Sequence, residues 1–213
     1  MKFKPITPPV TGWLEIDLDE NIITYLNELI DQSKIDNISM KDSLAGHISS
    51  SLALKDKEDY LMDNLLIECA NEYDKAFPSA SKLVNHIGTA QRLVISALWV
   101  NFQKKHEFNP YHDHGGVYSF VIWLRIPYEH AEQNSLPFLD GVKEEDRKAG
   151  MFEFQYYDIF GRTTHHGYRL GKDVEGVMLF FPAMFKHTVY PFYNTDETRV
   201  SVSGNLWLRP PNG

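Results

Sequence analysis

From residue 92 onwards, the sequence consists mostly of short segments rich in branched and aromatic residues, separated by turn-forming residues. Such segments favour β-strands, because these side chains pack well on a pleated surface. The expected strands cover residues 92–102, 120–126, 151–157, 163–170, 176–181, 188–192 and 200–208. Many short strands of this kind predict a β-sandwich or barrel. The polar segment 128–150 is expected to be an exposed insertion or lid between two of them.

The first 90 residues follow a different pattern. After a short strand near residues 13–18, apolar residues recur at helical spacing from Ile22 to Ile30, with Asp19 as a candidate N-cap. A second apolar stripe, between residues 56 and 77, predicts another helix that packs on a core. The 213 residues fit a single domain. We therefore expect a mainly β fold, with a helical part (about residues 1–90) packed outside a β core (about residues 91–210).

Composition narrows the class of protein. The net charge of −8 gives no sign of the excess positive charge with which proteins bind nucleic acid, so a nucleic-acid partner is disfavoured. The single cysteine, Cys69, excludes an internal disulfide and a cysteine-rich zinc site, and its apolar surroundings predict a buried thiol. The sequence opens with no signal peptide, and no apolar run approaches the roughly 18 residues of a membrane span. We expect a soluble, cytoplasmic protein with no membrane partner.

Three histidines are candidate metal ligands. His112 and His114 lie two positions apart, and residues i and i+2 of an extended strand point to the same face, so Asp113 would face away. His187 follows another apolar strand. In a two-sheet barrel, strands far apart in sequence face each other, so the three imidazoles could share one divalent cation. This arrangement leaves positions open for a bidentate co-substrate and for O2, as in non-haem iron oxygenases.

The last strand carries a row of polar residues. Alternation places four polar side chains on one of its faces: Arg199, Ser201, Ser203 and Asn205. Such a row in an apolar strand indicates a polar cavity. The guanidinium of Arg199 would bind a carboxylate bidentately, with a nearby hydroxyl as a second donor. The alternative is that Arg199 forms a surface ion pair with Asp196 or Glu197.

The order and spacing of these motifs resemble the iron(II)/2-oxoglutarate-dependent oxygenases, especially their small prolyl-hydroxylase-like and phage-encoded members. The resemblance covers roughly residues 92–208. It implies a double-stranded β-helix (jelly-roll) core that binds Fe(II), with 2-oxoglutarate chelating the metal and O2 as the other co-substrate. The matching segments are His112-Asp-His114, residues 118–124, Phe181-Pro182, His187-Thr-Val and Arg199-Val-Ser201.

The resemblance also implies roles for single residues. By position, His112 is the first metal ligand, His187 is the distal histidine and Arg199 anchors the far carboxylate of 2-oxoglutarate. Ser201 is then a second donor to that carboxylate, and Trp123 and Ser119 lie beside the co-substrate. One position departs from the family pattern, His-x-Asp or His-x-Glu, because the sequence has His114 there. Strand parity favours His114 over Asp113 as the middle ligand, which leaves the metal site one negative charge short.

The implied activity is that of a dioxygenase that hydroxylates a C–H bond, either in a protein side chain (prolyl-type) or in a small molecule. Asn101, Tyr118 and Asn205 are candidates for substrate contact, although packing or hydrogen bonding within the strands explains them equally well. The N-terminal helices and the 128–150 insertion are the expected substrate-contact regions. Two other functions remain open: a cupin-like three-histidine metal protein that acts without 2-oxoglutarate, and a non-catalytic jelly-roll binding module.

Overall fold

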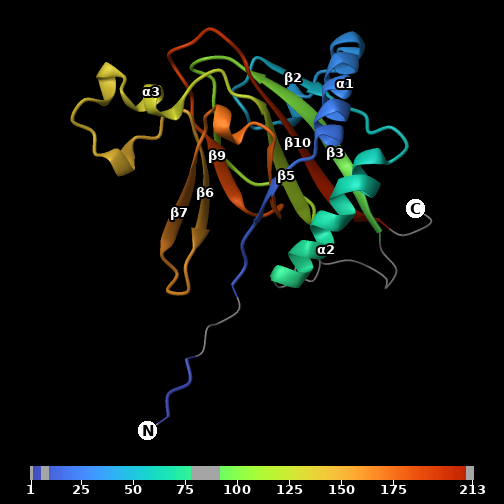
Figure 1. Cartoon of the computed structure of the whole chain (residues 1–213), viewed down its shortest axis with the longest axis horizontal. Coiled ribbons are helices and arrows are strands. Elements are labelled where there is room, and N and C mark those ends of the chain that lie inside the picture. Colours follow the sequence, from blue (N-terminus) through green and yellow to red (C-terminus); the bar gives the residue numbers. More distant parts are fainter. Residues whose placement is uncertain (1, 6–9, 78–91, 210–213) are drawn as a thin grey trace.

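Two antiparallel sheets form the body of the protein, as expected from the sequence (Figure 1). The computed structural model describes residues 2–5, 10–77 and 92–209. The larger sheet has six strands, in the order β1 (Leu14–Asp17), β8 (Val177–Pro182), β5 (Tyr118–Arg125), β10 (Arg199–Arg209), β3 (Arg92–Gln103) and β2 (Ser50–Ala53). The smaller sheet has four strands, in the order β4 (Asn109–His112), β9 (Lys186–Val189), β6 (Met151–Tyr157) and β7 (Thr163–Arg169).

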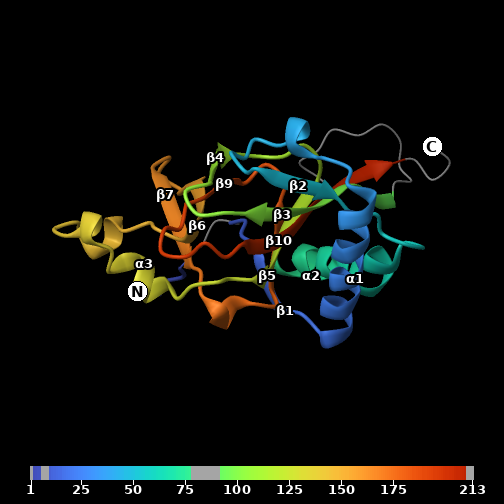
Figure 2. The ribbon, with the colours of Figure 1, turned by 90° about the horizontal axis from the view of Figure 1, so that it is seen from above.

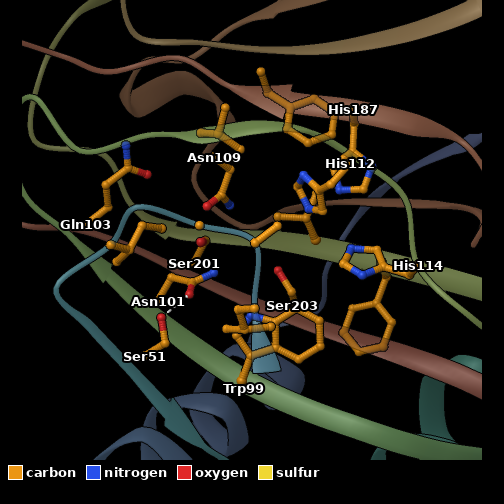
Figure 3. Close-up of a pocket in the computed structure, with 18 of the residues that line it drawn as sticks. Ser51, Trp99, Asn101, Gln103, Asn109, His112, His114, His187, Ser201 and Ser203 are labelled. Carbon is orange, nitrogen blue, oxygen red and sulfur yellow. Dashed lines mark hydrogen bonds between the residues drawn. The ribbon is translucent and has the colours of Figure 1, made fainter. Parts of the chain in front are cut away.

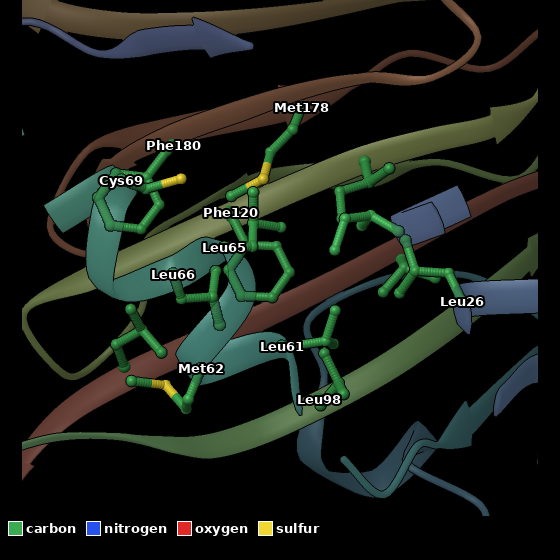
Figure 4. Packing of buried hydrophobic residues seen from close by; sticks show 14 of the residues in the cluster. Leu26, Leu61, Met62, Leu65, Leu66, Cys69, Leu98, Phe120, Met178 and Phe180 are labelled. Carbon is green, nitrogen blue, oxygen red and sulfur yellow. The ribbon is translucent and has the colours of Figure 1, made fainter. Parts of the chain in front are cut away.

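Helices cover the face of the larger sheet that points away from the smaller one (Figures 2 and 4). They are α1 (Glu20–Asp36) and α2 (Ile67–Ala76), the second preceded directly by a π-helical turn (Met62–Leu66). The predicted apolar stripes point into this interface, where Leu26, Leu66 and Tyr73 have no exposed surface. Cys69 is buried in the same cluster, as predicted.

The central strand β5 is buried on both faces, which explains why its sequence is almost continuously apolar. Phe120 and Ile122 pack toward the helices, whereas Val121 and Trp123 pack in a second core between the two sheets. Strand alternation therefore separates a helix-facing core from an inter-sheet core. The site described below lies between the sheets, beside that second core.

Two short strands, β2 and β4, lie outside the strand ranges expected from the sequence, although the metal-ligand prediction assumed an extended strand at His112 and His114. Strand β2 begins with two serines, and β4 contains Pro110. Proline lacks the N–H that a central strand needs, but β4 is an edge strand of the smaller sheet, where that loss is tolerated. The strand expected at 188–192 begins earlier, as β9 (Lys186–Val189).

One local prediction, the N-cap of α1, is corrected in detail. Asp19 occupies the N-cap position of α1, but its side chain makes no capping hydrogen bond, and its backbone carbonyl accepts from the N–H groups of Ile22 and Ile23. The 128–150 insertion contains the short helix α3 (His130–Asn134) and two 3-10 turns. Among the described residues, no helix combines the length and apolarity needed to span a bilayer.

Candidate metal centre

Three histidines converge between the two sheets (Figure 3). His112 ends β4 and is the register partner of His187 on β9. One ring nitrogen from each of His112, His114 and His187 lies within 4.8 Å of the other two. Bonds between a metal and an imidazole nitrogen are about 2 Å long, so a single ion can reach all three rings after small side-chain rotations.

His114 reaches this group for a reason other than the predicted strand parity, because β4 ends at His112. Beyond the strand, the backbone N–H of His114 donates to the carbonyl of Ala183 at 2.8 Å, which fixes the chain against the turn after β8. The ring of His114 then lies 5.0 Å from that of His112 and 5.1 Å from that of His187, centre to centre. Asp113 is exposed and is not part of the metal-ligand group.

Backbone carbonyls orient two of the rings. Nδ1 of His112 lies 2.7 Å from the carbonyl oxygen of Pro110, and Nδ1 of His187 lies 2.9 Å from that of Phe185. A carbonyl can only accept, so each Nδ1 carries the proton and donates it. This tautomer leaves the Nε2 lone pair of each ring free, and a hydrogen bond to Nδ1 of this kind is the usual support of a metal-bound histidine.

Burial keeps the imidazoles neutral. Desolvation lowers the pKa of His114 to about 4, with the neighbouring His112 as a second cause. Desolvation also lowers the pKa of His112, and it lowers the pKa of His187 well below the usual value. Three neutral imidazoles with free lone pairs form a donor set suited to a divalent transition metal.

A cavity of about 200 Å3 connects the histidines to Arg199. Arg199 is only 2% exposed, and its guanidinium donates to the Tyr128 hydroxyl and to Gln103 Oε1, each at 2.5 Å. Among the described residues, no carboxylate lies within ion-pair distance of it. The buried cation therefore faces the cavity without a counter-ion.

The alternative in which Arg199 forms a surface ion pair is wrong, because the two acidic candidates have other partners. Asp196 pairs with Lys105, and Glu197 pairs with Arg125. The guanidinium lies instead between the sheets, 5.5 Å from the centre of the Phe192 ring. A buried charge with no carboxylate partner among the described residues is costly unless an anion compensates it.

The remaining predicted site residues separate into two groups. Ser201, Trp123 and Asn101 line the cavity. Ser119 and Asn205 do not. Asn205 is the last residue of the polar row, and its register partner on β5, Ser119, donates a hydroxyl hydrogen bond to Asn205 Oδ1 at 2.7 Å.

Tyr118 is also outside the cavity, because alternation in β5 turns it toward the helices. There its ring packs on Tyr73 and Phe180, and its hydroxyl donates to Asp74 at 2.6 Å. We therefore assign Tyr118, Ser119 and Asn205 to packing and to hydrogen bonding within the fold.

Several lining residues were not predicted. Gln103 was detectable in principle, because alternation along β3 places Trp99, Asn101 and Gln103 on one face. Residues 43–46 and Ile48, between α1 and β2, also line the cavity, although no local pattern indicated them. No described residue of the 128–150 insertion does so; Tyr128, at its start, supports Arg199 instead. The predicted lid role of that insertion therefore gains no support.

Comparison with known proteins adds a family and a fold. Residues 97–205 match a family described as "Putative 2OG-Fe(II) oxygenase". A prolyl-4-hydroxylase from Pseudomonas putida is similar in structure, with a TM-score of 0.53 and 12% identity over 94% of this chain and 93% of the other. A 2OG-Fe(II) oxygenase family oxidoreductase from Burkholderia pseudomallei has a TM-score of 0.51 and 12% identity, over 92% of this chain and 84% of the other.

A third similar structure is a non-heme alpha ketoglutarate dependent carbocyclase from nogalamycin biosynthesis, with a TM-score of 0.53 and 10% identity over 93% of this chain and 80% of the other. At these identities the three structures establish the jelly-roll fold and nothing finer. No curated protein sequence matches the chain.

Proposed function

Because this chain belongs to the 2OG-Fe(II) oxygenase family, we propose that it is an active dioxygenase that uses Fe(II), 2-oxoglutarate and O2 to hydroxylate a C–H bond. In this proposal, His112, His114 and His187 hold the iron. When bound, the iron centre supplies the oxidation: one oxygen atom of O2 enters succinate as 2-oxoglutarate loses CO2, and the other enters the substrate as a hydroxyl group.

The observation that carries the proposal is the buried, unpaired guanidinium of Arg199, which shares a cavity with the three imidazoles. The cavity has a cation at one end and a metal site at the other. It therefore matches a ligand whose keto-acid end chelates the metal and whose far carboxylate pairs with the guanidinium. Ser201 lines the same cavity and offers a hydroxyl as a further donor to that carboxylate. Trp123 and Phe152 provide apolar walls that exclude water.

The charge of the site favours a dianionic co-substrate. Three neutral imidazoles leave the full charge of the iron uncompensated, and Arg199 adds another positive charge. 2-Oxoglutarate brings two negative charges, so its binding neutralises most of this excess. A three-histidine metal protein that acts without 2-oxoglutarate would leave the Arg199 charge unexplained.

The test is an anaerobic titration of the protein with Fe(II), with and without 2-oxoglutarate. We expect a charge-transfer absorption band that requires both, followed by iron-dependent succinate formation when O2 is admitted. Iron binding without the band and without succinate would support the cupin-like alternative. Absence of iron binding would leave a jelly-roll module used only for binding. As to the substrate, we propose a protein side chain or a small molecule.

A further inference from the structure

Three hydrogen-bond donors lie next to one another on the cavity wall that the larger sheet forms (Figure 3). Trp99 and Asn101 are two positions apart on β3, and alternation places both side chains on the face that lines the cavity. Ser203, on β10, is the register partner of Trp99 and also lines the cavity. The ring of Trp99 lies 5.8 Å from that of His114, centre to centre, so these donors are beside the metal centre.

These donors are not used within the fold. Asn101 is 6% exposed and Trp99 is 3% exposed. The hydroxyl of Ser51 donates to Asn101 Oδ1 at 2.6 Å, which orients the carboxamide and leaves Nδ2 as its free end. Among the described residues, Asn101 Nδ2 and Trp99 Nε1 have no hydrogen-bond partner, and both nitrogens remain accessible from the cavity. Because unused donors in a buried site are costly, we expect a ligand to accept from them.

The carboxamide oxygens around the cavity are used or out of reach. Asn101 Oδ1 is occupied, as described above, and Gln103 Oε1 accepts from Arg199 at 2.5 Å. Asn109 Oδ1 is buried against Gly46, where a Cβ atom would lie 1.9 Å from it, so a ligand in the cavity does not reach it. Serine hydroxyls can donate or accept and favour neither kind of ligand. The ligand group that fits therefore presents oxygen acceptors and no donor, as a carboxylate or a ketone does.

The charge of the loaded site selects the carboxylate. In the proposed function, Fe(II) and Arg199 bring three positive charges and 2-oxoglutarate brings two negative ones, which leaves one positive charge uncompensated. This excess arises because His114 is neutral where the family pattern has a carboxylate. Asp113, the one carboxylate among the described lining residues, is exposed, so water screens its charge. An anionic group beside His114 would compensate the excess where it arises.

We infer that Trp99, Asn101 and Ser203 form a subsite that binds a carboxylate of the substrate beside the metal centre. One carboxylate oxygen accepts from Asn101 Nδ2, and the other accepts from Trp99 Nε1 or from the Ser203 hydroxyl. The inference rests on the proposed function and narrows its substrate class to acids. Such a carboxylate belongs either to a small carboxylic acid or to an acidic side chain of a protein, and the experiment distinguishes the two.

Three nearly isosteric probes separate charge from hydrogen-bonding capacity: 3-methylbutanoate, 3-methylbutanamide and 4-methylpentan-2-one. The first is a carboxylate, the second is an uncharged amide with donors, and the third is an uncharged acceptor without donors. Ligand-observed NMR measures their binding to the full chain. Zn(II) replaces Fe(II) as a diamagnetic ion of equal charge, and saturating 2-oxoglutarate occupies Arg199.

We expect 3-methylbutanoate to bind about tenfold more tightly than either neutral probe, the effect of one hydrogen bond to a charged group. Equal or tighter binding of the amide or of the ketone would overturn the carboxylate subsite. A fourth probe, N-acetylglutamate methylamide, identifies the source of the carboxylate. Binding as tight as that of 3-methylbutanoate would identify a protein side chain, and weaker binding would identify a small acid.

A variant of Asn101 links the binding to the subsite. Asn101→Asp keeps an oxygen that accepts from Ser51 but replaces the donor end of the side chain by a second oxygen. We expect the preference to reverse: 3-methylbutanoate should bind about tenfold more weakly than to the unmodified protein, and 3-methylbutanamide should bind more tightly because its N–H groups gain an acceptor. A loss of folding alone would weaken both probes.

Asn205→Asp is the matched control. Asn205 also accepts from a serine hydroxyl, that of Ser119, but it lies outside the cavity, so the binding of both probes should stay unchanged. If Asn101→Asp does not fold, as judged by its circular dichroism melting curve, Trp99→Phe tests the same subsite by removing Nε1 while keeping an aromatic ring. Binding of 3-methylbutanoate should then weaken severalfold. Unchanged binding in the folded variant would place the carboxylate on the metal ion and overturn the subsite.

Failure of this inference and failure of the proposed function give different results. A charge-transfer band with Fe(II) and 2-oxoglutarate, together with no preference for 3-methylbutanoate, would overturn the subsite and leave the oxygenase proposal intact. Absence of the band, together with 3-methylbutanoate binding that Asn101→Asp weakens, would overturn the oxygenase proposal and leave the subsite intact. No binding of any probe overturns the subsite.

Discussion

His112 and His187 are register partners on adjacent strands, and their imidazole rings lie 4.3 Å apart, centre to centre. They are 75 positions apart in the sequence (187 − 112). Pairing of β4 with β9 in the smaller sheet brings them together, so the sheet register itself sets the spacing of two candidate ligands. Hydrogen bonds of both Nδ1 atoms to backbone carbonyls then orient the rings.

The first prediction concerns the middle ligand. His114→Ala should weaken Fe(II) binding by roughly tenfold or more, because even loss of an outer-shell partner of a metal ligand has effects of that size. Asp113→Ala is the matched control, since Asp113 is exposed and adjacent in sequence, and its iron affinity should stay close to that of the unmodified protein. Anaerobic titration calorimetry measures both. The reverse order of effects would transfer the ligand role to Asp113.

The second prediction concerns the anion anchor. Arg199→Ala should weaken 2-oxoglutarate binding by roughly 30-fold or more, since a buried charge partner is lost. Iron affinity without 2-oxoglutarate should change little, because Arg199 is not part of the metal-ligand group. Arg125→Ala is the control, since that arginine pairs with Glu197 on the surface. Unchanged 2-oxoglutarate affinity in Arg199→Ala would remove the guanidinium from the site.

The third prediction concerns pH and Glu153, a buried carboxylate on β6. Burial alone would raise its pKa, but hydrogen bonds from Lys148 at 2.6 Å and from Tyr111 and Tyr190 outweigh burial and lower the pKa below 4.5. A lowered pKa means that the ionised form stabilises the folded state above the unfolded-state pKa, and that this contribution disappears as the pH falls through the lower, folded-state value.

Glu153→Gln removes that titration. We expect the unmodified protein to lose free energy of unfolding as the pH falls below about 4.5, and the variant to lose less over the same interval. Urea denaturation at a series of pH values measures the difference. Glu145→Gln, at an exposed position in the insertion, should follow the unmodified protein. Identical pH profiles for Glu153→Gln and the unmodified protein would contradict the prediction.

The fourth prediction concerns the close contact of Gly46 with Asn109. Gly46→Ala would place a methyl group 1.9 Å from Asn109 Oδ1, so the loop or the asparagine must move. We expect a loss of about 1–3 kcal/mol in the free energy of unfolding, which is typical of overpacking. Ser49→Ala, exposed in the same loop, should stay within about 0.5 kcal/mol of the unmodified protein. A fully stable Gly46→Ala variant would show that the contact is not a constraint.

The sequence predicted the fold well where the strands are long and apolar. Strand β6 was expected at 151–157 and is found at Met151–Tyr157, because aromatic residues make up much of it and Gly150 precedes it. Strand β2 was not expected, and β4 was expected only as an extended segment at His112 and His114. Each has four residues with polar or proline content, and only pairing within a sheet makes it a strand. Whether such segments form strands depends on tertiary contacts and not on local preference.

The candidate site was predictable to the extent that it depends on alternation. The parity of β10 placed Arg199 and Ser201 correctly on the cavity wall. Alternation determines on which face of the strand a side chain lies, but not whether that side chain reaches the cavity. Asn205 is therefore on the same face as Arg199 and Ser201 but lies outside the cavity. Asn109 and Gly46 were beyond prediction, because a strand irregularity and a loop from a distant part of the chain bring them together.

The placement of residues 43–48 has a practical consequence for engineering. The iron-site histidines and Arg199 fall inside the segment that matches the oxygenase family, residues 97–205, whereas this loop precedes it by some fifty positions (97 − 48 = 49). Grafting an alternative hexapeptide between α1 and β2 would therefore reshape one wall of the cavity while the imidazoles and the guanidinium keep their supports. Selectivity of the protein could then be retuned separately from its oxidative chemistry.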